Sequence, residues 1–202
     1  MTQITHLFWD IGGVLLRTED PTPRQQLAQR FGMSARELEM LVFNSPTGKQ
    51  AQAGKIALHD HWQITLQQLG LPLSEQPAFE QAFFAGDRLD TNLLNFIAGL
   101  RPRCKTGIIS NAFISTRPLI DGEWGFNAIF DNITLSAEIG IMKPAPEIYH
   151  HALHSLNAQP QNSLFIDDFE HNVQAARALG MHAIRFENVE QTQQQILQAL
   201  TT

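Results

Sequence analysis

Four short runs of apolar, β-prone residues constrain the fold of this chain more than any other feature of its sequence. Each run ends in polar or glycine residues, and helical patterns lie between them. Buried strands that alternate with helices are typical of a parallel sheet whose right-handed crossovers place helices on its faces. The predicted strands are residues 6–10, 105–110, 163–167 and 182–186, and a shorter candidate at 128–130 could be extended by residues 133–135.

The predicted helices have recognisable ends. Asp90 or Thr91 is placed to cap one helix, Pro144 stands at the start of another, and Gly180 follows a third. These residue types are common at those helix positions. The helices are predicted at residues 91–100, 144–156 and 172–179, with a last one in the glutamine-rich tail, residues 191–198.

The stretch from residue 18 to residue 88 has a different pattern, with several amphipathic helices and no convincing strand. One helix starts at Ser34, whose spacing from Glu37 is that of a capping box. A helical block between the first and second strands indicates an inserted cap. The expected fold is α/β, a doubly wound parallel (Rossmann-like) sheet core with an inserted small α-helical cap. The expected division is a core of residues 1–17 and 89–202 and a cap of residues 18–88.

Composition excludes several classes of protein. The 202 residues are 43% hydrophobic and 17% charged, which is ordinary for a globular chain. The net charge of −6, without a run of basic residues, argues against nucleic acid or an anionic membrane as a partner. The single cysteine, Cys104, forms no intrachain disulfide and is predicted to be a structural thiol. With no targeting or membrane-spanning segment in the sequence, we expect a soluble, cytoplasmic protein.

The first predicted strand ends in a carboxylate, Asp10, followed by Gly12 and Gly13. Glycines let the backbone wrap closely around a ligand, so that N–H groups can hold phosphate oxygens and a carbonyl can face a cation. The alternative is a simple turn in which Asp10 accepts hydrogen bonds from backbone donors.

Two further strand ends or loops carry groups that suit an anion. The second strand ends in Ser110 and Asn111, which could donate to phosphate oxygens or cap the next helix. Lys143 stands beside Pro144 at a helix start, where its charge opposes the macrodipole. Lys143 could reach back over the sheet edge. The alternative is a solvated lysine, which is the common case at helix starts, and the unfavourable placement weakens that alternative slightly.

The third strand runs into two adjacent carboxylates, Asp167 and Asp168. They repel each other at close range, and a hard cation with oxygen ligands would relieve that repulsion. The alternative is that Asp168 caps the next helix while Asp167 faces water. Ligands of open parallel sheets bind at the carboxyl ends of the strands, so the common position of these groups favours one site.

Taken in order, these residues resemble the motifs of the haloacid dehalogenase-like hydrolases. The motifs are FWDIGGVL, IISNA, KP with PEIY downstream, and FIDD with NVQAARALGM downstream. The resemblance covers almost the whole chain, and the last motif is the most specific. The DIGGV form is most similar to the branch of sugar-phosphate phosphatases and epoxide-hydrolase phosphatase domains.

The resemblance implies a Mg²⁺-dependent hydrolase of a small phosphate ester, a sugar phosphate or another phosphorylated metabolite. Asp10 would attack phosphorus and form an aspartyl phosphate. It implies a metal site of Asp10, the Gly12 carbonyl, Asp167 and Asp168. It implies contacts to the phosphate, and charge neutralisation, from Ile11, Gly12, Ser110, Asn111 and Lys143.

One position departs from the family pattern. Phosphatases of this family usually carry a second aspartate two residues after the nucleophile, which protonates the leaving oxygen, and here that residue is Gly12. General acid–base help is worth about 10²–10⁴-fold, so we expect slow hydrolysis of alkyl phosphates. Acyl, aryl and anomeric phosphates, which have better leaving groups, would suffer less. A cap residue could substitute, and His59, Asp60 and His61 are the candidates by chemistry.

Two alternatives remain compatible with these residues. A metal-independent dehalogenase would tolerate Gly12, although Asp167 and Asp168 would then crowd the nucleophile without a cation. A catalytically weak phosphate-binding or regulatory protein would explain the missing general acid but would have little use for Asp10.

Overall fold

The computed structural model describes residues 3–201, and its core is a parallel sheet. The strand order is β5-β4-β1-β6-β7, and every neighbouring pair is parallel. The chain fills one side of β1 first and then crosses to the other side, so the predicted α/β class with a doubly wound sheet is confirmed. The strands are β1 (His6–Trp9), β4 (Lys105–Ser110), β5 (Asn132–Leu135), β6 (Ser163–Asp167) and β7 (His182–Arg185).

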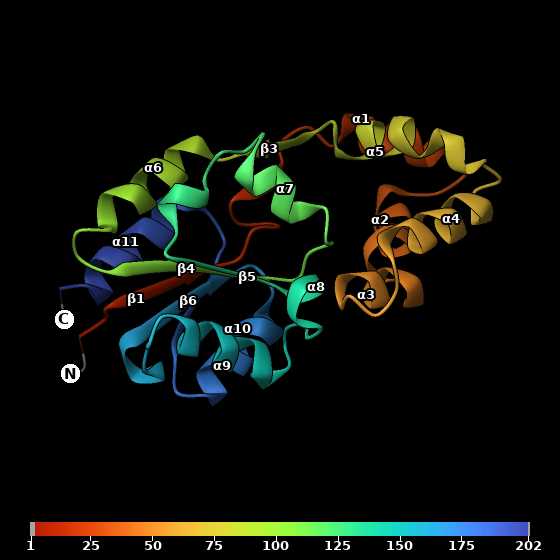
Figure 1. Ribbon diagram of the computed structural model, residues 1–202. Coiled ribbons are helices and arrows are strands. Elements are labelled where there is room, and N and C mark those ends of the chain that lie inside the picture. Colours follow the sequence, from red (N-terminus) through yellow and green to blue (C-terminus); the bar gives the residue numbers. More distant parts are fainter. Residues whose placement is uncertain (1–2, 202) are drawn as a thin grey trace.

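Helices cover both faces of this sheet (Figure 1). Asp90 caps α6 by accepting a hydrogen bond from the backbone N–H of Leu93 at 2.8 Å. Gly180, with φ +85°, follows α10 and confirms the predicted stop. One face carries α6 (Thr91–Leu100) and α11 (Val189–Ala199), and the other carries α9 (Pro146–Ser155) and α10 (Glu170–Ala178). Two shorter helices are α7 (Thr116–Asp121) and α8 (Ser136–Ile139).

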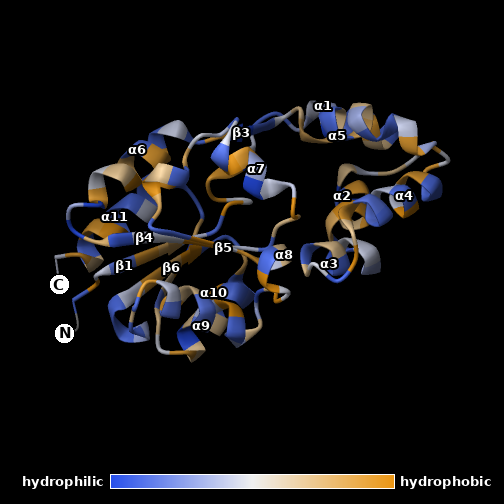
Figure 2. Cartoon of the chain, viewed as in Figure 1, coloured by the Kyte–Doolittle hydropathy of each residue, from blue (hydrophilic) through white to orange (hydrophobic). Residues whose placement is uncertain are grey.

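Alternation along β1 divides the core into two apolar clusters. Leu7 and Trp9 point to the α6 and α11 face, whereas Phe8 points to the α9 and α10 face. All three are fully buried, which explains why the strands are continuous apolar runs. Figure 2 shows apolar strands between helices that turn polar residues to solvent. Burying a large apolar side chain contributes about 1.5–3 kcal/mol.

The strand predicted at residues 128–130 is wrong. The segment Asn127–Ile129 is a 3₁₀ helix, and the edge strand is β5, which includes the predicted extension at residues 133–135. Phe130 is buried as a side chain of the core cluster, so its apolar character reflects packing and not strand pairing. The Asp131 carboxylate accepts from the backbone N–H of Thr106 at 2.8 Å and fixes this turn.

Residues 18–88 were expected to contain no strand, and this was wrong at both ends. The short strands β2 (Leu16–Thr18) and β3 (Asp87–Leu89) pair antiparallel and join the core to the cap. Strands of three residues are too short to show a period in the sequence. The buried Arg24 of the cap links this strand pair to the cap helices. Its guanidinium forms ion pairs with Asp87 of β3 at 2.8 Å and with Glu39 at 2.6 Å.

The cap helices pack around their own apolar cluster, at the carboxyl end of the core strands (Figure 1). Trp62 and Phe83 are buried in it, and Ser34 makes the predicted capping box. Among the described residues, no helix has the length and apolar composition that crossing a bilayer requires. The cap helices are α1 (Thr22–Gln29), α2 (Ala35–Glu39), α3 (Pro46–Gln52), α4 (Leu58–Gln68) and α5 (Gln76–Phe84), with a π-helical turn at Met40–Asn44 and a 3₁₀ turn at Leu73–Glu75.

The cap is docked on the core by specific contacts. The buried hydroxyl of Ser136 in α8 donates to the carbonyl of Gln52 in α3 at 2.6 Å. Phe113, from the loop after β4, is inserted into the cap cluster, where its ring stacks on Phe43 at 5.8 Å. Gly54 approaches the core so closely that a β-carbon there would lie 2.4 Å from the carbonyl oxygen of Ala137. The cap therefore interlocks with the loops at the carboxyl edge of the sheet.

Candidate active site

The register of the sheet brings the polar strand ends together. Trp9 pairs with Ile166 of β6, so the residues that follow them, Asp10 and Asp167, are neighbours. On the other side of β1, Ser110 is the last residue of β4. Parallel strands end at one edge of a sheet, and the structure places these three predicted site residues at that edge.

Lys143 stands between two of the carboxylates. Its Nζ lies 2.9 Å from Oδ1 of Asp10 and 2.6 Å from Oδ2 of Asp167. The three side chains are 1%, 8% and 0% exposed, and Nζ also lies 5.4 Å from the centre of the Phe165 ring. Charges so shielded from water interact strongly, and removal of Lys143 would leave two buried carboxylates without their partner. The helix that follows begins at Pro146, two residues later than predicted, so Lys143 belongs to the loop.

Asp167 accepts hydrogen bonds with both oxygens. Its Oδ1 accepts from the backbone N–H of Phe169 at 2.9 Å, and Nδ2 of Asn172 lies 3.0 and 3.1 Å from the two oxygens. Lys143 donates to Oδ2. Asp167 is thus fully buried and holds Lys143 in place. The alternative in which Asp167 faces water is wrong.

Asp168 is held differently. Its Oδ1 is buried and accepts no hydrogen bond from the described residues. One carboxylate oxygen each from Asp10, Asp167 and Asp168 can be chosen so that all three lie within 4.8 Å of one another. Lys143 pairs with two of these three carboxylates, and the negative charge that remains suits a divalent cation with oxygen ligands. The residues present therefore fit the Mg²⁺ that the sequence resemblance implies.

Gly13 is the residue against which Asp168 packs. It has φ +76°, and a β-carbon there would lie 2.4 Å from Oδ2 of Asp168. We expect Gly13→Ala to displace this carboxylate and to weaken Mg²⁺ binding at least tenfold in a calorimetric titration. The left-handed backbone should also cost about 1–2 kcal/mol of unfolding free energy.

Gly32→Ala is the matched control for this prediction. Gly32 has φ +68°, but a β-carbon there meets no atom within 4 Å. The control should therefore lose similar stability and keep the Mg²⁺ affinity of the wild type. Equal Mg²⁺ affinities for the two variants would contradict the assignment of Asp168 as a ligand.

Ser110 and Asn111 have different partners. The Ser110 side chain is 2% exposed and hydrogen bonds to the Asp10 carboxylate. Asn111 binds the backbone of Lys143 twice, with Nδ2 donating to its carbonyl at 3.0 Å and Oδ1 accepting from its N–H at 2.8 Å. Neither residue caps the next helix, which starts at Thr116. The Asn111 side chain, which was expected at the phosphate, thus positions Lys143.

The turn after β1 wraps around Asp10, as its glycines suggested. The backbone N–H of Ile11 donates to Oδ1 of Asp10 at 2.7 Å, and the Ile11 side chain is buried in the core. Gly12 is exposed and its β-carbon position is open. The turn thus both satisfies Asp10 and leaves Gly12 accessible beside it.

Burial and neighbouring charges shift the ionisation of this cluster. Burial raises the pKa of Asp10 to about 7, against the opposing charge of Lys143. Burial, followed by the charge of Asp167, raises the pKa of Asp168 to about 6. Burial opposes the charge of Lys143, but Asp10 and Asp167 outweigh it and raise the pKa of Lys143. A cation beside the carboxylates would favour their ionised forms.

Two residues that position the site were not predicted. Asn172 was recognised only as part of a motif, yet its amide holds both oxygens of Asp167. Tyr149 is fully buried, and its hydroxyl donates to the carbonyl of Asn172 at 3.0 Å. The available signal was spacing, because Asn172 lies in the first helical turn after the acidic pair.

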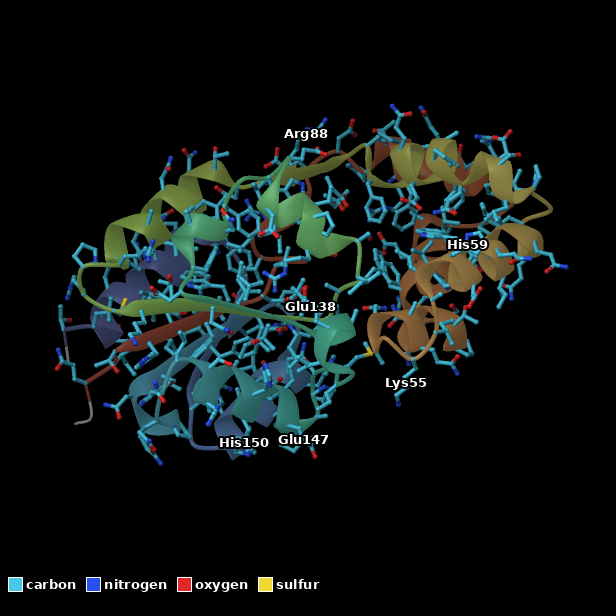
Figure 3. All side chains as sticks on the ribbon, viewed as in Figure 1. Lys55, His59, Arg88, Glu138, Glu147 and His150 are labelled. Carbon is cyan, nitrogen blue, oxygen red and sulfur yellow. The ribbon has the colours of Figure 1, made fainter. Side chains whose placement is uncertain are left out.

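The remaining candidates have other surroundings. His61 is buried in the cap, with Nδ1 3.0 Å from the Thr47 hydroxyl and its ring 5.4 Å from that of Phe113. His59 and Asp60 are exposed on α4, and Figure 3 shows the position of His59. Cys104 is buried, and burial raises its pKa to about 11, as befits a structural thiol.

Comparison with known proteins identifies the family. The family model described as haloacid dehalogenase-like hydrolase matches residues 4–180. The chain belongs to the haloacid dehalogenase-like hydrolases. The predicted family and the predicted hydrolase class are therefore confirmed.

Two curated relatives of this hydrolase match most of its length. A sesquiterpene phosphatase of Aspergillus oryzae is 32% identical over 86% of this chain and 85% of its own. A D-ribitol-5-phosphate phosphatase of Bacteroides thetaiotaomicron is 25% identical over 92% of this chain and 93% of its own.

Solved structures share the fold of this hydrolase. A HAD-like family hydrolase from Porphyromonas gingivalis has a TM-score of 0.83 at 20% identity, with both chains fully covered. A HAD family enzyme from Bacteroides thetaiotaomicron, solved with magnesium and inorganic phosphate, has a TM-score of 0.75 at 21% identity and covers 91% of this chain and 94% of its own.

Proposed function

We propose that this hydrolase is a Mg²⁺-dependent phosphatase acting on a small phosphate ester, a sugar phosphate or another phosphorylated metabolite. The observation that carries the proposal is the buried cluster in which Asp10, the Lys143 ammonium and the unpaired oxygen of Asp168 meet. Phosphoryl transfer needs a nucleophile and positive charge on the transferring oxygens, and this cluster can supply both. The two relatives above are phosphatases, which supports the same activity.

In the proposed reaction, an Asp10 oxygen attacks phosphorus and the leaving oxygen departs on the opposite side. The phosphoryl group then rests on Asp10 until water releases it as inorganic phosphate. Lys143, the Ser110 hydroxyl and the backbone of the Ile11–Gly12 turn would neutralise the phosphoryl oxygens. Asn111 would act by holding Lys143 in position.

Mg²⁺ would be held by Asp10, Asp168 and the carbonyl of Gly12. Asp167 would add negative charge but no direct bond, because its oxygens already accept from Lys143, Asn172 and the backbone. When bound, the cation reduces the repulsion between an anionic nucleophile and an anionic phosphate. The magnesium and inorganic phosphate in the similar structure support the proposal that this hydrolase binds the same cation and anion.

Hydrolysis of p-nitrophenyl phosphate tests the proposal. After removal of metal with a chelator, we expect turnover to fall to the buffer rate and to return when MgCl₂ is added. Turnover that persists in excess chelator would contradict a metal-dependent reaction. Halide release from 2-chloropropionate without Mg²⁺ would favour the dehalogenase alternative, and no turnover of any phosphate would favour the binding protein.

A further inference from the structure

The exposed face of α9 is rich in histidine. This helix of ten residues carries three of the eight histidines of the chain, and all three are exposed. Its other face packs on the sheet through apolar side chains of the buried core. The core therefore fixes the helix and leaves one polar face open to solvent, which includes Glu147, His150, His151 and His154.

Helical spacing makes these side chains neighbours. His150 and His154 are four residues apart, and Glu147 precedes His150 by three. Residues three or four apart in a helix lie on the same side, with about 5–6 Å between their β-carbons. Figure 3 shows Glu147 and His150 on the outer side of α9, away from the sheet. The two imidazoles of His150 and His154 therefore stand on successive turns of one exposed stripe.

The ligand atoms on this stripe are not engaged elsewhere. Within the part of the chain that the structure describes, the side chains of Glu147, His150 and His154 form no hydrogen bond, ion pair or ring contact. A bound ion would therefore displace only water from them, and no existing interaction would have to break. The spacing of the backbone is also set in advance, because the buried face holds the helix.

Binding of an ion here requires only the rotation of side chains. Among the described residues, the carboxylates of the active site are the one group of three potential ligands whose atoms lie within 4.8 Å of one another. Exposed side chains change rotamer within picoseconds to nanoseconds, so His150 and His154 can turn toward one ion while the backbone stays in place. The helix thus offers a site of two imidazoles, with water in the remaining coordination positions.

The donor atoms select the class of ion. Imidazole nitrogen suits Zn²⁺, Cu²⁺ and Ni²⁺, whereas Mg²⁺ prefers oxygen ligands. Two histidines four residues apart on one face of a helix are a recurring pair of zinc ligands. The carboxylates of the active site and the imidazoles of α9 therefore favour different cations, and Mg²⁺ can fill the first site without occupying the second.

We propose that His150 and His154 bind a Zn²⁺ ion on the outer face of α9, at a site separate from the active site. The carboxylate of Glu147 adds negative charge one turn before His150 and favours the cation. The ion links two turns of the helix and stabilises the folded protein, because the unfolded chain does not hold the two imidazoles at this spacing. The site does not depend on the proposed phosphatase function.

Competition with a chromophoric chelator measures Zn²⁺ affinity, and excess Mg²⁺ keeps the carboxylates of the active site occupied. The variants His150→Gln and His154→Gln each leave a single imidazole. Because the second imidazole of the pair binds the ion intramolecularly, we expect its loss to lower Zn²⁺ affinity about 10²-fold. Glutamine is a good helix former, so both variants should keep the fold, and thermal unfolding without Zn²⁺ verifies this.

His59→Gln is the matched control. His59 is an exposed histidine of the cap helix α4 (Figure 3), but the residues three and four positions after it are Trp62 and Gln63, which offer neither imidazole nor carboxylate. This variant removes one exposed imidazole without breaking a helical pair. It should therefore keep the Zn²⁺ affinity of the wild type.

The melting temperature gives a second readout. Zn²⁺ at about a hundredfold excess over its dissociation constant should raise the melting temperature of the Mg²⁺-loaded wild type by about 5 °C. The same rise is expected for His59→Gln, and it should be lost in His150→Gln and His154→Gln. Wild-type Zn²⁺ affinity in either α9 variant, or an equal loss of affinity in His59→Gln, overturns the proposal.

Discussion

Asp10→Asn is expected to abolish phosphatase turnover without unfolding the protein. The amide has the shape of the carboxylate, and its oxygen can still accept from Lys143 and from the backbone N–H of Ile11. It carries no negative charge and cannot form the covalent bond to phosphorus. Loss of a nucleophile costs roughly 10⁴-fold or more in kcat, so we expect the variant to reach only the buffer rate with p-nitrophenyl phosphate and Mg²⁺.

Stability distinguishes this loss from misfolding. Burial raises the pKa of Asp10 to about 7, so the ionised carboxylate opposes folding at neutral pH and the neutral amide relieves that penalty. The metal-free variant should therefore melt at or above the wild-type temperature. Asp121→Asn, an exposed aspartate at the end of α7, should leave both turnover and melting unchanged. Residual turnover in Asp10→Asn near the wild-type rate would rule out Asp10 as the nucleophile.

Lys143→Met should cost both activity and stability. Methionine fills a similar volume, but it leaves Asp10 and Asp167 as buried carboxylates without the ammonium group between them. Removing one partner of a buried ion pair costs about 3–5 kcal/mol of unfolding free energy. Turnover should fall at least about 10²-fold, since the variant also lacks the positive charge that would neutralise the transferring phosphoryl oxygens.

Urea unfolding measures the stability change, and Lys55→Met provides the control. Lys55 is an exposed lysine of the cap (Figure 3), so its replacement should shift the free energy of unfolding by less than about 0.5 kcal/mol. Added Mg²⁺ should stabilise Lys143→Met more than the wild type, because the cation then compensates otherwise unpaired carboxylates. A loss below about 1 kcal/mol for Lys143→Met would show that the pair is not held as described.

The sequence predicted that Asp10, Ser110 and Asp167 lie together, because residues at the ends of parallel strands are close in space even when they are far apart in the chain. Once the apolar runs are placed in a parallel sheet, Asp10, Ser110 and Asp167 must share an edge, whatever lies between them in the chain. The acidic pair also indicated a cation through charge alone. The predicted fold class and family depended on the same few positions.

Other features depend on contacts that no local pattern records. The Asn111 amide binds the Lys143 backbone, and the Tyr149 hydroxyl reaches Asn172, through pairs that lie 32 and 23 residues apart. The three-residue strands β2 and β3 also leave no recognisable pattern in the sequence, because each forms by pairing with the other. Apolar residues near Phe130 misled the strand assignment, since burial in a turn and burial in a strand select the same side chains.

The insertion of Phe113 into the cap means that the end of β4 and the loop after it contact both the cap and the candidate active site. Ser110, three residues upstream, contacts Asp10, while the Phe113 ring belongs to the apolar cluster of the cap. Any swing of the cap away from the sheet must either drag this loop with it or extract the ring from its aromatic neighbours. The position of the cap and the arrangement of the side chains beside Asp10 are therefore linked through residues 110–113.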